Sequence, residues 1–177
     1  MDIYINNLIH IIWIIIPAYI ANGTPVVVSK LLSSRNIARH PIDFGKTFID
    51  GRRVLGDSKS WEGLISGIIA GLVTSLIQYL IEGNPIAIVR GFILSIGAMA
   101  GDIIGAFIKR RIGLKPGEPL PIVDQLMFII IALSLAIIFK LIRITLTQFI
   151  FVLLLTFLLH IATNYIAYKL NLKDVPW

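Results

Sequence analysis

The feature that most constrains this chain is a series of long apolar segments. A membrane-spanning helix needs about 20 mostly apolar residues, because the hydrocarbon core of a bilayer is about 30 Å thick. The mean hydropathy of the 177 residues is +0.87, and only 15% of them are charged, against about 25% in soluble domains. There are five apolar segments, at about residues 3–32, 61–81, 86–108, 125–139 and 144–167.

None of these segments shows the alternation of a strand, and only helices or closed barrels satisfy their backbone groups in lipid. We therefore expect an all-α, polytopic membrane protein with about five transmembrane helices, built as one domain over residues 1–177. Residues 1–10 contain no Lys or Arg, so the first segment lacks the basic start of a secretory signal. We expect it to remain in the protein as a helix, and we expect the short fourth segment to have the least defined ends.

The positive charges are unevenly distributed. Two polar loops, at about 33–60 and 109–124, lie on one side of the membrane because two crossings separate them. With the residues flanking them and the C-terminal end, this side carries 13 of the 16 Lys and Arg residues. The positive-inside rule then predicts a cell-membrane protein with both loops and the C-terminus in the cytoplasm and the N-terminus outside. The net charge of +6 is explained by this bias and by anionic lipid, so we expect no nucleic-acid partner.

Two further patterns concern helix packing. Glycines recur every four residues in the second and third segments, which favours close approach of helices, and we expect these two segments to pack on each other beneath the loops. Asn22-Gly23-Thr24-Pro25 should interrupt the first helix. Asn22 then either lines a polar cavity or belongs to a kink without further role. The two ladders are Gly63, Gly67, Gly71 and Gly97, Gly101, Gly105.

Two carboxylates are the sharpest candidates for chemistry. Asp102 precedes Lys109 by seven residues, about 10 Å along a helix, so it should lie inside the membrane, where a charge is costly and usually functional. A structural ion pair with a neighbouring helix is the alternative. Asp124 either caps the fourth helix or joins Asp102 at one site. The chain has no Cys, and its histidines show no ligand spacing, with His160 expected near the outer end of its span. Two carboxylates then favour a hard ion such as Mg²⁺.

Basic residues and a hydroxyl flank the same segments. Ser60 is a candidate N-cap of the second helix, and Glu62 favours a helix N-terminus; together with Lys59, this terminus is also a candidate phosphate site. Lys109-Arg110-Arg111 is either a membrane anchor or, with the Gly- and Pro-rich loop that follows, a second phosphate-binding element.

These residues resemble a known family. Gly101-Asp102, Lys109-Arg110-Arg111 and Asp124 are similar to the C-terminal block of the membrane CTP:phospholipid cytidylyltransferases, the CDP-diacylglycerol synthases. The segment 59–63, Lys-Ser-Trp-Glu-Gly, is similar to their upstream block. The short chain, the form Gly-Asp-Ser-Lys at 56–59 and the ending Val-Pro-Trp at 175–177 resemble the archaeal branch, the CDP-archaeol synthases.

The resemblance implies transfer of CMP from CTP to a prenyl ether glycerol phosphate lipid, with release of pyrophosphate. It implies Mg²⁺ bound by Asp102 and Asp124, and catalytic roles for these two residues with Lys59 and Lys109. Its implied substrate-binding residues are Asn22, Asp57, Ser60, Glu62, Arg110 and Arg111.

The chain departs from the larger family at two positions. Pro116 and Met127 stand where the larger family has acidic residues, so Asp43, Asp57 or the triphosphate itself must complete a two-metal site.

A small transporter or channel with an intramembrane acidic site is the alternative function. A CDP-alcohol phosphotransferase is disfavoured because its helix motif of several spaced aspartates is absent.

Overall fold

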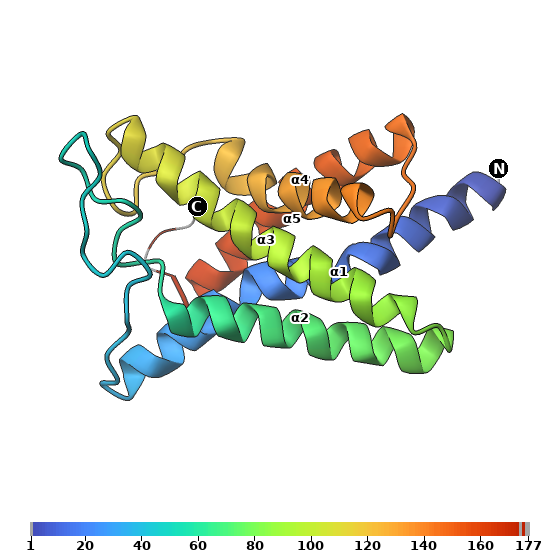
Figure 1. The fold of residues 1–177 in the computed structure, drawn as a ribbon, viewed down its shortest axis with the longest axis horizontal. Coiled ribbons are helices and arrows are strands. Elements are labelled where there is room, and N and C mark those ends of the chain that lie inside the picture. Colours follow the sequence, from blue (N-terminus) through green and yellow to red (C-terminus); the bar gives the residue numbers. More distant parts are fainter. Residues whose placement is uncertain (1, 174, 176–177) are drawn as a thin grey trace.

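The computed structural model describes residues 2–173 and 175, and is helical throughout the membrane-spanning part (Figure 1). The predicted all-α, polytopic fold is confirmed, and each predicted segment corresponds to one helix. Pro176 and Trp177, part of the C-terminal motif, lie outside the described residues. The helices are α1 Asp2–Ser34, α2 Trp61–Glu82, α3 Ile86–Arg111, α4 Val123–Ile138 and α5 Leu146–Lys169.

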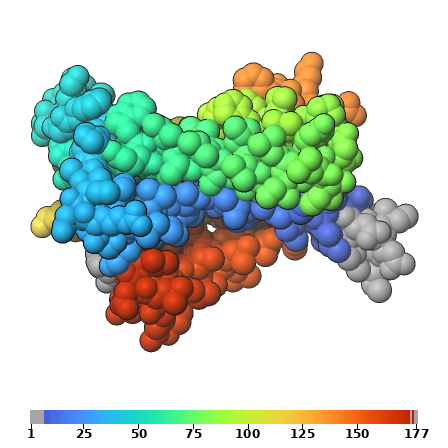
Figure 2. Space-filling view, turned by 90° about the horizontal axis from the view of Figure 1, so that it is seen from below, coloured from blue at the N-terminus to red at the C-terminus, as the bar shows by residue number. Residues whose placement is uncertain are grey.

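Four of the helices are long and apolar enough to cross a membrane, and α4 is apolar but has only 16 residues. The two charged loops and the C-terminal segment gather at one end of the bundle, while the N-terminus lies at the other end (Figure 1). Viewed on another face, α1 lies between α2 and α5 (Figure 2). The fully buried apolar side chains in the core come from α1, α3, α4 and α5, and include Ile15, Leu94, Ile129 and Val152.

Helix α1 is continuous, so the predicted interruption at residues 22–25 is wrong. It contains two prolines, Pro17 and Pro25. Proline lacks a backbone N–H, so Pro17 leaves the carbonyl of Trp13 without its usual intrahelical partner. The fully buried side chain of Gln78 in α2 donates to that carbonyl at 2.5 Å. A neighbouring helix therefore supplies the missing hydrogen bond, as membrane proteins require.

The glycine ladders bring helices into close contact, and the predicted packing of the second span on the third is confirmed, because the α2 ladder contacts α3. A Cβ atom on Gly67 of α2 would lie 2.6 Å from the Met99 sulfur in α3 and 2.7 Å from the Ala21 carbonyl oxygen in α1. A Cβ atom on Gly101 of α3 would lie 2.5 Å from the carbonyl oxygen of Met127 in α4. The α2 ladder thus faces α1 and α3, whereas the α3 ladder faces α4.

The long loop between α1 and α2 is organised around the buried carboxylate of Asp43. It accepts from Arg53 Nη2 at 2.7 Å and from the backbone N–H groups of Leu55 and Gly56 at 3.0 Å. The hydrogen bond from Arg53 is the main reason that the pKa of the Asp43 carboxyl is held well below its usual range; the backbone donors add to this against the opposing effect of burial. Asp43 is thus a structural residue, with both oxygens occupied within its own loop.

The same loop is fastened to the end of α3 by Arg111. Its Nη1 donates to Asp50 at 2.6 Å, its Nη2 donates to the carbonyl oxygen of Arg53 at 2.5 Å, and its guanidinium stacks over the rings of Phe48 and Phe107. The two polar loops therefore form one connected layer over the helix ends.

Candidate active site

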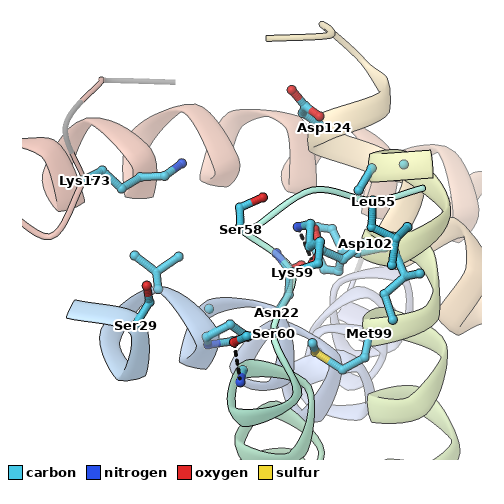
Figure 3. A pocket seen from close by; sticks show the side chains of 18 of the residues that line it. Asn22, Ser29, Leu55, Ser58, Lys59, Ser60, Met99, Asp102, Asp124 and Lys173 are labelled. Carbon is cyan, nitrogen blue, oxygen red and sulfur yellow. Dashed lines mark hydrogen bonds and ion pairs between the residues drawn. The ribbon is translucent and has the colours of Figure 1, made fainter. Parts of the chain in front are cut away.

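A cavity of about 660 Å³ opens where the helix ends meet the polar loops. All five helices, both loops and the C-terminal segment contribute to its lining. Figure 3 shows side chains from α1, α3, α4, the first loop and the C-terminal segment around the cavity. The predicted site residues that the structure brings to its lining are Asn22, Lys59, Ser60, Asp102, Lys109, Arg110 and Asp124.

Asp102 is paired with Lys59 across two elements. The Nζ of Lys59 donates to both carboxylate oxygens of Asp102, at 2.7 and 2.6 Å. Lys59 is placed there because Ser60, the next residue, is the N-cap of α2: its hydroxyl accepts from the Gly63 N–H at 3.3 Å. The predicted N-cap role of Ser60 is confirmed, and the alternative of an ion pair for Asp102 is the arrangement that the structure contains.

Asp124 is paired with Lys109 in the same way. The Nζ of Lys109 donates to the two oxygens of Asp124 at 3.0 and 2.9 Å, and the Leu120 N–H donates to the second of them at 2.8 Å. Asp124 does not cap α4, because the N-cap is Ile122 and Asp124 lies within the first turn. It instead closes the preceding loop and joins the end of α3 to the start of α4. Two lysine–aspartate pairs thus line one cavity.

Arg110 is a buried cation of this cavity. Its side chain is held by a hydrogen bond from Nη2 to the Lys115 carbonyl oxygen at 3.0 Å. Its Nε has no partner within the part of the chain that the structure describes. A buried guanidinium with an unused donor is suited to an additional anionic group.

Three predicted substrate-binding residues lie elsewhere. The side chain of Asp57 is 77% exposed and is bonded to Arg53 at 2.8 Å. Glu62 accepts from the ring Nδ1 of His40 at 2.6 Å, and Arg111 fastens the loop. None of the three belongs to the cavity lining that the structure describes.

The cavity wall formed by α5 and the chain after it was not predicted from the sequence. His160, Thr163, Asn164 and Lys173 line the cavity, so the prediction that His160 lies near the outer end of its span is wrong. His160 is nine residues from the end of α5 on the side of the polar loops. The signal was present in the sequence, because residues 160, 163 and 164 share one face of an otherwise apolar helix.

The cavity lining has more cations than carboxylates. It includes Arg39, Lys59, Lys109, Arg110 and Lys173, against Asp102, Glu118 and Asp124. In the part of the chain that the structure describes, no group of three or more His, Asp or Glu side chains could hold a metal ion without other ligands. A cationic cavity with hydroxyl and amide groups at the edge of the apolar part of the bundle is suited to phosphate groups, including one attached to a lipid.

Comparison with known proteins places these features in a family. A sequence profile of the CarS-like CDP-archaeol synthases matches residues 4–177. The chain is 42% identical to the CDP-archaeol synthase of Archaeoglobus fulgidus over 98% of this chain and 99% of that one. It is 40% identical to the CDP-archaeol synthase of Pyrococcus furiosus over 97% and 99% of the two chains.

A solved structure has the same fold. It is described as an intramembrane enzyme for archaeal membrane lipids biosynthesis, and it superposes with a TM-score of 0.80 at 38% identity. The match covers 89% of this chain and 94% of that one.

Proposed function

Because the chain belongs to the CarS-like CDP-archaeol synthase family and is therefore a CTP-dependent cytidylyltransferase, we propose that it transfers CMP from CTP to an unsaturated archaeal ether-lipid phosphate. The acceptor is a glycerol phosphate with two geranylgeranyl chains in ether linkage, and the products are CDP-archaeol and pyrophosphate. The observation that carries this proposal is the single cavity in which two aspartates and five cations meet at the boundary between apolar helices and polar loops.

The proposed reaction needs positioning more than a base. An oxygen of the lipid phosphate, already anionic near pH 7, attacks the α-phosphorus of CTP and forms a new P–O bond. The bond from the α-phosphorus to the bridging oxygen of the β-phosphate breaks, and its electron pair leaves with pyrophosphate. Lys59, Ser60, Lys109 and Arg110 would bind and neutralise the phosphates, and Asn22 would line the polar floor of the cavity. Holding the reactants and stabilising their charge in this way is sufficient for large rate enhancements.

Asp102 and Asp124 are suited in type and number to Mg²⁺. This ion is usually held by one or two carboxylates together with substrate phosphates and water, which fits a cavity that offers two carboxylates. Bound Mg²⁺ would neutralise charge on the triphosphate. Lys59 and Lys109, which now bond to these carboxylates, would then turn to the phosphates. Since Asp43 is committed to its loop and Asp57 lies outside the lining, we propose that the triphosphate supplies the remaining ligands.

We further propose the orientation that the charges favour. The chain forms one domain in the cell membrane, with both loops and the C-terminus in the cytoplasm and the N-terminus outside. In this orientation the cavity opens to the compartment that holds CTP, and the lipid tails remain in the bilayer.

The direct test is a comparison of three lipids with purified protein, labelled CTP and Mg²⁺ in one detergent. We expect pyrophosphate release with a prenyl ether glycerol phosphate, slower release with an acyl phosphatidic acid of matched length, and none with the dephosphorylated alcohol. Apolar walls separate similar chains by only about 1–3 kcal/mol, whereas the alcohol lacks the attacking group. Equal rates with the phosphate and the alcohol would contradict the mechanism. Turnover of the ether lipid alone would indicate that a polar residue such as Asn22 distinguishes the ether from the ester linkage.

A further inference from the structure

The wall formed by α5 and the C-terminal segment has no role in the proposed mechanism so far. Asn164 accepts a hydrogen bond from Lys173 Nζ at 3.0 Å, and His160 and Thr163 lie on the same side of α5. Figure 3 shows Lys173 reaching into the cavity from the side opposite to Lys59 and Asp102. This wall therefore presents a cation, an amide and an imidazole to the same space that the two lysine–aspartate pairs border.

The electrostatic surroundings of Lys173 favour an anion beside it. The pKa of Lys173 is lowered, mainly by burial. The positive charges of Lys59 and Lys109 lower it further, whereas the carboxylates of Asp124 and Asp102 raise it. A half-buried ammonium among other cations gains most from a multiply charged anion that enters the same cavity.

The position of α5 indicates which anion reaches this wall. Only Val152 and Thr156 are buried among the described side chains of α5, and its outward residues, such as Leu154, Leu158 and Ile161, are 62%, 65% and 49% exposed. The helix therefore separates the cavity from the surrounding lipid. Asn164 lies five residues before the end of α5 at Lys169, which is about 8 Å along the helix, so its side chain meets the cavity below the polar loops.

The chemistry of the reaction gives a second reason. In an in-line displacement at phosphorus, the attacking and leaving oxygens lie on opposite sides of the reacting atom. Lys59, Ser60 and Arg110 lie at the helix ends near the loops through which a nucleotide enters, so the leaving pyrophosphate belongs on their side. The attacking phosphate then belongs on the opposite side, along α5.

We propose that Lys173, Asn164 and His160 form the subsite for the phosphate of the lipid substrate. Lys173 and the amide N–H groups of Asn164 donate to the phosphate oxygens, and His160 lies deeper, towards the glycerol. The inference rests on the proposed function, and it divides the cavity into a nucleotide side on α2 and α3 and a lipid side on α5.

Separate KM values for the two substrates test this division. In Lys173→Met, which keeps the length but removes the charge, we expect the KM for the prenyl lipid phosphate to rise about tenfold or more, since one charge-assisted hydrogen bond is lost. The KM for CTP should stay within about twofold, and Lys173→Arg should recover part of the loss. Lys169→Met is the matched control, because Lys169 lies over the ring of Tyr165 and outside the cavity lining; it should change neither KM.

Binding measurements keep the test valid if Lys173→Met is inactive. Protection against thermal unfolding is measured with Mg²⁺-CTP, with the lipid phosphate and with its alcohol, since a ligand that binds only the folded state raises stability. The subsite is supported if CTP protects the variant as well as the wild type, but the lipid phosphate no longer protects it more than the lipid alcohol does. If protection by CTP and protection by the lipid phosphate weaken equally, Lys173 belongs to the nucleotide site and the proposal is wrong. Unchanged protection by both ligands also overturns the proposal. Should wild-type protein bind the lipid phosphate without turnover, the proposed function fails while these binding results still decide the subsite.

Discussion

Among single residues, Asp102 carries the strongest expectation. Asp102→Asn keeps the shape of the side chain and removes the charge that Lys59 contacts. We expect turnover to fall at least about 100-fold, as when a residue that stabilises the transition state electrostatically is lost. Stability should change by no more than about 1 kcal/mol, because the pair is partly solvated. CDP-lipid formation and thermal unfolding in detergent measure the two effects.

Glu82→Gln is a suitable comparison for Asp102→Asn. Glu82 also accepts from a basic side chain, Arg90 at 2.8 Å, and from Trp13 at 2.7 Å, but it lies at the opposite end of the bundle. Its variant should lose stability while each folded molecule keeps its turnover. If Asp102→Asn behaves like Glu82→Gln, then Asp102 is a structural ion-pair residue and its assignment to Mg²⁺ is wrong.

Asp43 gives an expectation about pH. At pH 7, Asp43→Asn should lower the free energy of unfolding by about 1–3 kcal/mol, because a buried set of donors loses its charged acceptor. The folded-state pKa is depressed below the unfolded value of about 3.9. The contribution of the carboxylate is therefore complete above that value and is lost as the pH falls through the folded-state pKa. Unfolding of both proteins between about pH 8 and pH 3 should show a constant gap that narrows only below about pH 4; a gap already narrowing near pH 6 would contradict this account.

At the scale of the helices, the contact between α3 and α4 positions Asp124. In Gly101→Ala the added methyl group would meet backbone atoms of α4, the Met127 carbonyl oxygen at 2.5 Å and the Phe128 Cα at 2.6 Å. Backbone cannot turn aside as a side chain can, so α4 must shift, and we expect a loss of about 1–3 kcal/mol in stability. Turnover should fall as well, because Asp124 moves with its helix.

Gly23→Ala provides the stability control for Gly101→Ala. Gly23 lies within α1, and a Cβ atom there has no neighbour within 4 Å. Alanine favours a helix over glycine by up to about 1 kcal/mol, so this variant should be at least as stable as the wild type. Thermal unfolding of the two variants side by side separates close helix contact from a general effect of glycine replacement.

The helices and the packing of α2 on α3 were predictable from the sequence, but the partner of the α3 glycine ladder was not. Each span follows from the length and hydropathy of its own segment, which do not depend on the neighbours. The partner of the Gly97–Gly105 ladder depends on how α3 is rotated, and both α2 and α4 were available to it. The hydrogen bond from Gln78 to the Trp13 carbonyl oxygen, which compensates for Pro17 in α1, was equally unpredictable, because partners from other helices enter no local pattern.

The side chains that line the candidate site were likewise only partly predictable from the sequence. Lys109, Arg110 and Arg111 are consecutive, and each step along a helix turns by about 100°, so the three side chains cannot share one destination. The structure sends Lys109 and Arg110 to the cavity and Arg111 to Phe48 and Asp50. Asp102 and Asp124 were predictable because a charge within or beside a span is costly wherever it points. His160 and Asn164 are uncharged, so their contribution depended on which helices surround the cavity.

For the whole molecule, the central expectation is the orientation in the membrane. The chain contains no Cys, so a single introduced cysteine reports its side without background. Gly45 and Gly117 have positive φ angles, so their exposed neighbours Lys46 and Pro116 are better positions for substitution. Lys46→Cys and Pro116→Cys should react with an impermeant thiol reagent only from the cytoplasm, and Asn84→Cys only from outside. Reaction of the first two from opposite faces would rule out a single site.

The attachment of the long loop by Arg111 has a consequence for proteolysis. Residues 35–59 contain six Lys and Arg residues, each a potential trypsin site, but a protease must draw several residues into an extended form before it cuts. The Arg53 carbonyl oxygen, part of one such bond, is held by Arg111, and the loop around it is closed by Asp43. Membranes with the loops exposed should therefore yield this segment to trypsin slowly. Arg111→Gln should hasten the cut without exposing any new cleavage sequence, so the digestion rate would report how often the layer over the helix ends opens.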